Sequence, residues 1–323
     1  MRKAWPRVTG FLAVATLAAT QSCAMQQDDG SRFREPIPQA SEVEVSGPDG
    51  AAAAQAGPSA SAAGTGSEPW ANGPWAKYYG FTRHVRDGVN GVTAVVLGGV
   101  WLVVHTQPSD VAEHQAIWGP WDDSLSPATY RFRVVEVGER EYQYFLEGRK
   151  KSSGSDADWR AVLSGEGFGR RHAKHGDGNF SIDLDVAEEL DPFEHADDSG
   201  TLTITHQLST PDKTVSADMK PSATERWWTA ASTRHSDGSG TLLVNAHDDV
   251  DDSKTTALED VVIDSRWRAD GAGRADITIS GGDVGALVVT ANECWSTDFM
   301  RSYYSDSVDY APTEGDVTAC SLP

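Results

Sequence analysis

Recognisable catalytic motifs are missing from this sequence of 323 residues. It contains no Gly-x-Ser-x-Gly nucleophile motif, no His-Glu-x-x-His zinc motif and no glycine-rich phosphate loop that ends in Lys and Ser or Thr. Paired carboxylates have no diagnostic value, because an acidic chain contains them throughout. We therefore expect a protein that is not an enzyme and needs no cofactor. A hydrolase whose site the sequence does not reveal is the third of three alternatives considered below.

Basic residues are scarce. The chain has 27 Lys and Arg against 48 Asp and Glu, which gives a formal net charge of −21 at pH 7. A field of this sign repels phosphate backbones, so nucleic acid is excluded as a partner. The acidic residues are scattered along the chain rather than gathered in a tail, which is typical of a solvated surface.

The first residues are typical of an export signal. Arg2, Lys3 and Arg7 precede the apolar stretch Phe11–Ala19, which is too short for a stable membrane span. Cys23 follows, and a cysteine at this place resembles the bacterial lipoprotein signal, in which the cysteine is acylated and becomes the mature N-terminus. Removal of the three basic residues with the signal takes the formal charge from −21 to −24.

Two routes of cleavage are open. Ser22 fits the pattern before the lipoprotein cysteine, whereas Thr20 and Gln21 depart from it. Ordinary signal cleavage after Ala24 is the alternative. On the lipoprotein route, the resemblance to Gram-negative signals implies anchoring in the outer membrane, because Ala24 rather than Asp follows Cys23. Both routes export the chain, with the domain on the periplasmic or the cell-surface face.

The chain has three cysteines. Cys23 belongs to the signal, which leaves Cys294 and Cys320 as a pair in an exported protein. An oxidising compartment favours a disulfide between them, and their Cα atoms should then lie about 4.4–6.8 Å apart. Four aromatic side chains are expected to pack beneath the C-terminal tail that this bond holds: Trp295, Phe299, Tyr303 and Tyr304.

Composition divides the mature chain in two. Residues 24–75 are rich in Ala, Gly, Ser and Pro and are expected to form a disordered tether. Residues 76–323 contain short runs in which apolar and polar residues alternate, separated by turns, as in half-buried strands. These runs are Tyr130–Val134, Tyr142–Leu146, Phe180–Val186, Gly200–His206, Val215–Met219, Thr241–His247, Val261–Trp267 and Ala275–Ile279. We predict a mainly β domain: a large antiparallel meander that forms a barrel, half-barrel or sandwich.

One segment breaks the alternation. Val89–His105 is apolar on every face and has Gly98 and Gly99 at its centre. Its β-branched runs fit a hairpin with a two-residue turn, but a hairpin apolar on both faces needs burial on both. A helix apolar all round is a buried helix, and the two glycines would destabilise it by about 1 kcal/mol each. We favour one buried apolar helix near the start of the domain over the hairpin, and both over a transmembrane span.

Tryptophan is abundant, with 11 residues. Its large apolar surface and single donor suit a core, a hydrophobic pocket or a platform on which sugars stack. Neighbouring Trp227 and Trp228 should point to opposite faces of one strand. The candidate ligand-lining or stacking side chains are Trp101, Trp118, Trp121, Trp227, Trp228 and Trp267.

No metal centre is expected. The weak candidate is the acidic run that contains Asp248, Asp249, Asp251 and Asp252, which would hold calcium loosely. The run lacks the glycine and the terminal glutamate of an EF-hand loop. We favour a solvated loop without an ion over a calcium site.

Several short segments of the domain carry a family resemblance. They resemble a family of mostly β lipoproteins from GC-rich Gram-negative bacteria, and they are Trp118–Trp121, Leu146–Gly148, Ser265–Trp267, Gly271–Asp276, Glu293–Phe299 and Tyr303–Asp306. The resemblance covers most of residues 76–323 and implies a lipoprotein, but it carries no activity. A curved sheet with a buried helix is also similar in plan to periplasmic carriers of lipids and lipoproteins.

Two hypotheses of function stand ahead of the hydrolase. The first is a non-enzymatic, membrane-anchored lipoprotein whose β domain binds a lipid or other hydrophobic ligand in an apolar cavity. The second is a surface structural or adhesive module, in which exposed tryptophans would stack on polysaccharide.

Overall fold

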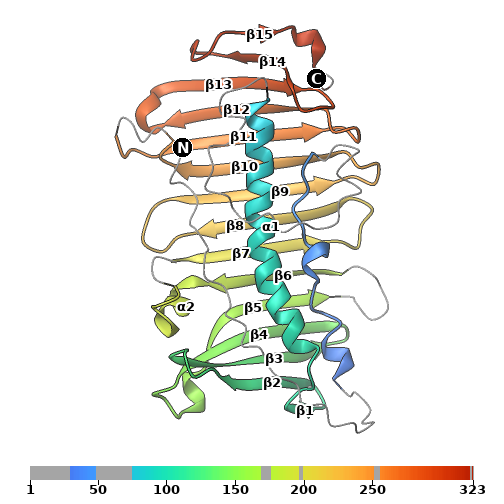
Figure 1. Ribbon diagram of the computed structural model, residues 1–323, viewed down its shortest axis with the longest axis vertical. Helices are drawn as coiled ribbons and strands as arrows, with labels where there is room; N and C mark the ends of the chain where they lie inside the picture. Colours follow the sequence, from blue (N-terminus) through green and yellow to red (C-terminus); the bar gives the residue numbers. More distant parts are fainter. Residues whose placement is uncertain are drawn as a thin grey trace.

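The computed structural model describes residues 30–48, 75–168, 176–195, 199–250, 255–320 and 322. Within them, 15 strands form a single antiparallel sheet, and each strand pairs with the next one along the chain (Figure 1). The strands are β1 (Asp110–Ala112), β2 (Gln115–Asp122), β3 (Ala128–Gly138), β4 (Glu141–Lys150), β5 (Arg160–Phe168), β6 (Asp177–Asp183), β7 (Thr201–Gln207), β8 (Lys213–Lys220), β9 (Trp227–Arg234), β10 (Gly240–Asp248), β11 (Glu259–Trp267), β12 (Gly273–Gly281), β13 (Gly285–Trp295), β14 (Arg301–Asp306) and β15 (Glu314–Gly315).

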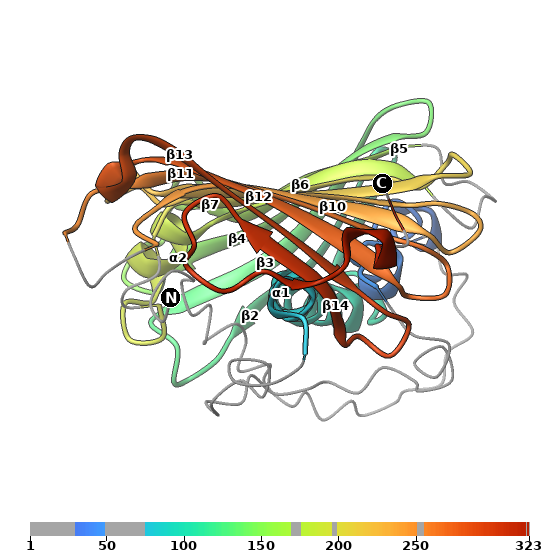
Figure 2. The ribbon, with the colours of Figure 1, turned by 90° about the horizontal axis from the view of Figure 1, so that it is seen from above.

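The sheet is curved and open, with β1 and β15 as its two edges. Figure 2 shows the strands bending around helix α1 (Lys77–Val104), which lies against the concave face and crosses the strands. Alternate side chains point into this face, where Trp118, Phe132 and Phe180 are fully buried. The predicted mainly β meander is confirmed, and its form is the half-barrel.

Helix α1 confirms the helix predicted within Val89–His105, and the alternative hairpin is wrong. The helix has 28 residues and is therefore about 42 Å long. Val89, Val96 and Val100 are buried against the half-barrel at helical spacing. The sheet covers the apolar side chains of one face of the helix. A hairpin of the same composition would have had two apolar faces, and the sheet could have covered only one of them.

The opposite face of α1 is uncovered in its C-terminal half. Ala94, Val95, Gly98, Trp101 and Leu102 recur at helical spacing on this face, and we call them the outer stripe. Val95, Trp101 and Leu102 are 46%, 44% and 51% exposed. By length and composition alone, α1 is long and apolar enough to cross a membrane, a test that core helices of soluble proteins pass as well. The expectation of a helix buried all round is therefore wrong for one face.

Residues 30–48 differ from the expected tether. They form two short 3₁₀ turns, Ser31–Phe33 and Ala40–Glu42, and Phe33 and Val43 are completely buried. Widely spaced apolar residues cannot build a core of their own, but here they fill space beside α1. The rest of the predicted tether, residues 24–29 and 49–74, lies outside the described residues.

The side chain of Asn90 shows how this N-terminal segment is attached. Its Oδ1 accepts the backbone N–H of Val45 at 2.7 Å, and its Nδ2 donates to the Val45 carbonyl at 3.0 Å. The side-chain amide of Asn90 therefore pairs with the backbone of Val45 as a residue of a neighbouring strand would. The Ser46 N–H donates to Ser232 Oγ at 3.1 Å, which joins the segment to β9 as well.

All eight alternating runs contain strand residues, but the clearest one ends early. Strand β6 stops at Asp183, and the short helix α2 (Leu184–Leu190) follows. The Asp183 carboxylate accepts the N–H of Val186 at 3.0 Å, so it caps the first turn of α2. Three apolar residues of α2 pack on Ala128 and Val162 in a small separate core: Val186, Ala187 and Leu190.

Leu97 and Leu102 provide a matched test of how α1 is placed. Leu97 is 1% exposed and belongs to the core, whereas Leu102 is on the outer stripe. We expect Leu97→Ala to lower the free energy of unfolding by about 2–5 kcal/mol. Leu102→Ala should change it by less than about 0.5 kcal/mol. Urea unfolding followed by circular dichroism measures both, and equal losses would contradict the placement.

Candidate functional site

A buried carboxylate fixes the start of α1. Glu293 of β13 has no exposed surface, and its oxygens accept the backbone N–H groups of Lys77 at 2.9 Å and Tyr78 at 2.6 Å. These are among the N–H groups that a helix leaves unpaired in its first turn, and a negative charge is favourable there. Arg301 of β14 donates to the same carboxylate at 2.9 Å and also pairs with Glu314.

Burial of Glu293 disfavours the ionised form of its carboxyl group. Burial raises the pKa of Glu293 above its ordinary value, although the Tyr78 and Lys77 amides and Arg301 favour the ionised form. Two of its partners are backbone N–H groups of the first turn of α1, so this carboxylate positions the helix. The sequence analysis missed this role, although the inward-facing place of a glutamate between Ala291 and Trp295 in an alternating strand could have indicated it.

We expect a pH dependence of stability from Glu293. Because the folded-state pKa is raised, its contribution is fully present below the ordinary pKa of 4.5 and is lost as pH rises through the folded-state value. Glu293→Gln removes this loss, so the variant should gain stability relative to the natural protein as pH rises. Urea unfolding between pH 4 and 8 would measure the difference, and a difference that is constant with pH would contradict the assignment.

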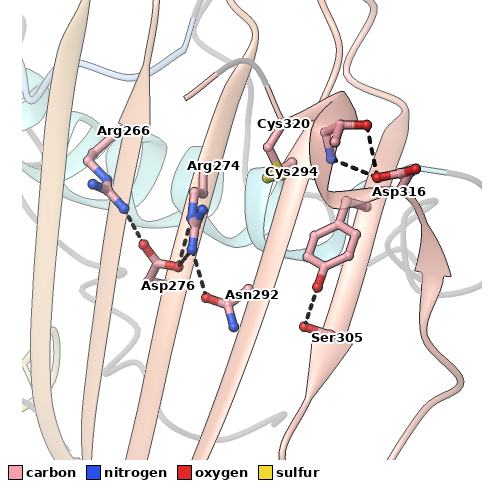
Figure 3. Close-up of a disulfide and its surroundings, with 10 residues drawn as sticks. Arg266, Arg274, Asp276, Asn292, Cys294, Ser305, Asp316 and Cys320 are labelled. Carbon is pink, nitrogen blue, oxygen red and sulfur yellow. Dashed lines mark hydrogen bonds and ion pairs between the residues drawn. A yellow bond between two sulfur atoms is a disulfide. The ribbon is translucent and has the colours of Figure 1, made fainter. Parts of the chain in front are cut away.

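The predicted disulfide is present at the C-terminal end of the sheet (Figure 3). Cys294 and Cys320 are bonded with their Cα atoms 5.5 Å apart. Beside the bond, Arg274 donates to Asp276 and, at 3.1 Å, to Asn292. These residues alternate with side chains that face α1, so the disulfide holds the tail on the opposite face of the sheet.

The aromatic residues expected beneath the tail are divided between the two faces. Tyr303 lies opposite Cys294 in the strand register, and Tyr304 lies opposite Glu293, on the side of α1. Trp295 is buried there too, and Phe299 stacks on Tyr79 of α1 with ring centroids 4.3 Å apart. The expectation is therefore wrong for Trp295 and Phe299, whose rings contact Tyr79 of α1.

Replacing both cysteines tests the contribution of the disulfide. The bond closes a loop with a sequence separation of 26 residues, so the Cys294→Ala/Cys320→Ala variant should lose about 3 kcal/mol of stability. Hydrogen exchange should become fast in β15 while β11 and β12 stay protected. Unchanged stability and exchange in the double variant would contradict the expectation.

The six candidate tryptophans do not form one site. Trp118 is fully buried and donates to the Thr106 carbonyl at 3.1 Å, and Trp267 is also buried. Trp121 and Trp228 are partly buried against the core. Trp227 is 36% exposed and lies over the ring of His247, so the prediction that it and Trp228 point to opposite faces is confirmed.

Trp101 is the remaining candidate, and it belongs to the outer stripe. Its ring stacks on His105 one turn later, with centroids 4.0 Å apart, and keeps 44% of its surface exposed. The exposed face of α1 differs between the two halves of the helix. In the N-terminal half the exposed residues include the charged Arg83 and Asp87, whereas the outer stripe in the C-terminal half is apolar. An apolar surface confined to the C-terminal half of a helix is a candidate contact site.

The side chain of Arg226 neutralises part of the acidic run at the end of β10. Arg226 lies 3.1 Å from an oxygen of Asp248 and 3.9 Å from one of Asp249. Asp251 and Asp252 lie outside the described residues. Within the part of the chain that the structure describes, no group of three or more His, Cys, Asp or Glu side chains is arranged to hold a metal ion.

An open hollow of about 430 Å³ lies where β9–β12 end. Its lining includes His235, Asp237, Arg266 and Arg268, with Leu322 at one side. Its size falls in the range of ligand pockets, but its charged lining and open mouth differ from an enclosed apolar cavity. On the concave face, α1 and residues 30–48 pack against the sheet. A hydrophobic ligand on that face would therefore have to bind beside α1 or on it.

Comparisons with protein-family models, curated proteins and solved structures found no match.

Proposed function

We propose that this protein is an exported, membrane-anchored lipoprotein that binds a lipid or another hydrophobic ligand and catalyses no reaction. The observation that carries the proposal is the outer stripe of α1, an apolar helix face left open to solvent. The export signal ending at Cys23 supports the anchor. The resemblance of the domain to mostly β lipoproteins supports the class of protein.

The shape of the outer stripe suits an acyl chain. A side chain added at Gly98 would meet no atom within 4 Å, so the helix surface is bare between its larger neighbours. Val95 and Trp101 rise on either side of this position along the helix. A methylene group that a ligand buries fully is worth about 0.8 kcal/mol, so this bare surface favours an apolar chain over a polar ligand.

Polysaccharide binding has less support from the geometry. Stacking needs a row of exposed aromatic faces, whereas Trp118 is buried and Trp121 and Trp228 are partly buried. Trp227 alone among these four is one of the exposed large hydrophobic residues. The hydrophobic ligand is therefore the function we propose.

Binding of a fluorescent fatty acid tests the proposed site. We expect saturable binding to the full-length mature protein and about a tenfold weaker affinity for Leu102→Asp, a loss of about 1.4 kcal/mol. Leu287→Asp is the matched control, because Leu287 is 63% exposed on β13, far along the sheet from the stripe. Equal affinities of the two variants, or no saturable binding at all, would contradict the proposal.

A Cys23→Ala variant tests the proposed anchor separately. Without the acylated cysteine, the protein should move from the membrane fraction to the soluble fraction after cell breakage. Unchanged fractionation, together with an N-terminal peptide free of acyl groups in the natural protein, would contradict anchoring at Cys23.

A further inference from the structure

The described chain begins at one particular end of the half-barrel. Arg34 donates to the carbonyl of Thr106 at 3.1 Å, just beyond the C-terminus of α1. Arg32 pairs with Glu136 of β3 at 3.5 Å. In Figure 1 this blue segment starts beside β1–β3 and runs along α1 toward the middle of the sheet. Gly30 is thus held near the β1 edge.

The distance from Gly30 to the proposed anchor is short. Gly30 is seven residues after Cys23 in the sequence. A chain spans at most about 3.6 Å per residue, so the two are at most about 25 Å apart. Most of the tether expected from composition follows residues 30–48 in the sequence. It therefore cannot lengthen the connection between Cys23 and this end of the domain.

The same end of the molecule carries exposed apolar side chains. Trp101 and Leu102 are in the last turns of α1, and Val111 of β1 is 41% exposed. Tryptophan is enriched where membrane meets water, because its ring is apolar and its N–H can face the headgroups. These three exposed apolar residues thus lie at the same end of the domain that an acylated Cys23 would hold to the bilayer.

Electrostatic attraction does not account for this coincidence. The charged groups around the three residues include Arg34, but also Asp110 and Glu113. A mixture of signs on a protein of net charge −21 gives no preference for anionic lipids. The contact that this surface can make is with the apolar interior of the bilayer.

We propose that the C-terminal end of α1 and strand β1 rest on the bilayer into which the Cys23 acyl chains insert. Trp101, Leu102 and Val111 enter the lipid, and the outer stripe opens directly onto it. This inference rests on the proposed anchoring at Cys23. It places the hydrophobic ligand site where a lipid can pass between the bilayer and α1 without crossing water.

A single fluorescent label tests the contact. With Cys23 acylated and Cys294 bonded to Cys320, an introduced cysteine is the one free thiol of the full mature chain. Leu102→Cys and Leu287→Cys are labelled with an environment-sensitive dye, and the proteins are reconstituted in phosphatidylcholine vesicles that contain doxyl-labelled lipid. We expect a blue shift and quenching at position 102, at least about twofold greater than at position 287.

Two other outcomes would overturn the inference. Equally weak quenching at the two positions means that the domain stands clear of the lipid, and equally strong quenching means that the contact is not specific to this end. A blue shift at position 102 without quenching by doxyl lipid means that protein, such as a second copy, covers the stripe. The acylation state of Cys23, read from the mass of the N-terminal peptide, separates the two proposals. An acylated Cys23 with an unquenched label refutes the docking alone, whereas an unmodified Cys23 refutes the anchor as well.

Discussion

The position of α1 depends on the buried Glu293 carboxylate. Glu293 accepts two N–H groups of the first helical turn and binds Arg301, so the helix start is joined to β13 and β14 at one point. The hydroxyls of Thr82 and Ser265, 2.7 Å apart, add a second polar contact to β11. Farther along, α1 packs on the sheet through apolar side chains such as Leu97. A helix fixed in this way keeps its outer stripe turned away from the sheet.

Sequence patterns predicted the parts of the fold that depend on local alternation. The period-two runs identify strands because one face of each strand is buried and the other is not, and this holds for β3 or β11 without knowledge of their partners. Helix α2 was missed because Leu184 and Val186 continue the alternation of β6, and the capping by Asp183 shows only in the structure. Residues 30–48 could not be predicted from composition, since their few apolar residues are buried only because α1 and β9 lie beside them.

The candidate site was less predictable than the fold. The disulfide follows from counting cysteines in a chain that is expected to be exported, and the structure confirms the bond. The outer stripe could not be identified, because a segment that is apolar on all faces does not reveal which face the sheet will cover. The same limit applies to the tryptophans: Trp118 and Trp101 look alike in the sequence, yet the first is buried in the half-barrel and the second is exposed on α1. Glu293 was noted only as part of a resemblance, although its inward-facing place already set it apart.

We propose a half-barrel that is tied to a membrane and offers an apolar helix face to a lipid. Native mass spectrometry of the intact protein, extracted from membranes in mild detergent, tests this claim most directly. The account predicts the mass of a chain that begins at Cys23, increased by the acyl groups, together with a population that carries one further bound lipid. A chain without acyl groups and without bound lipid would contradict it.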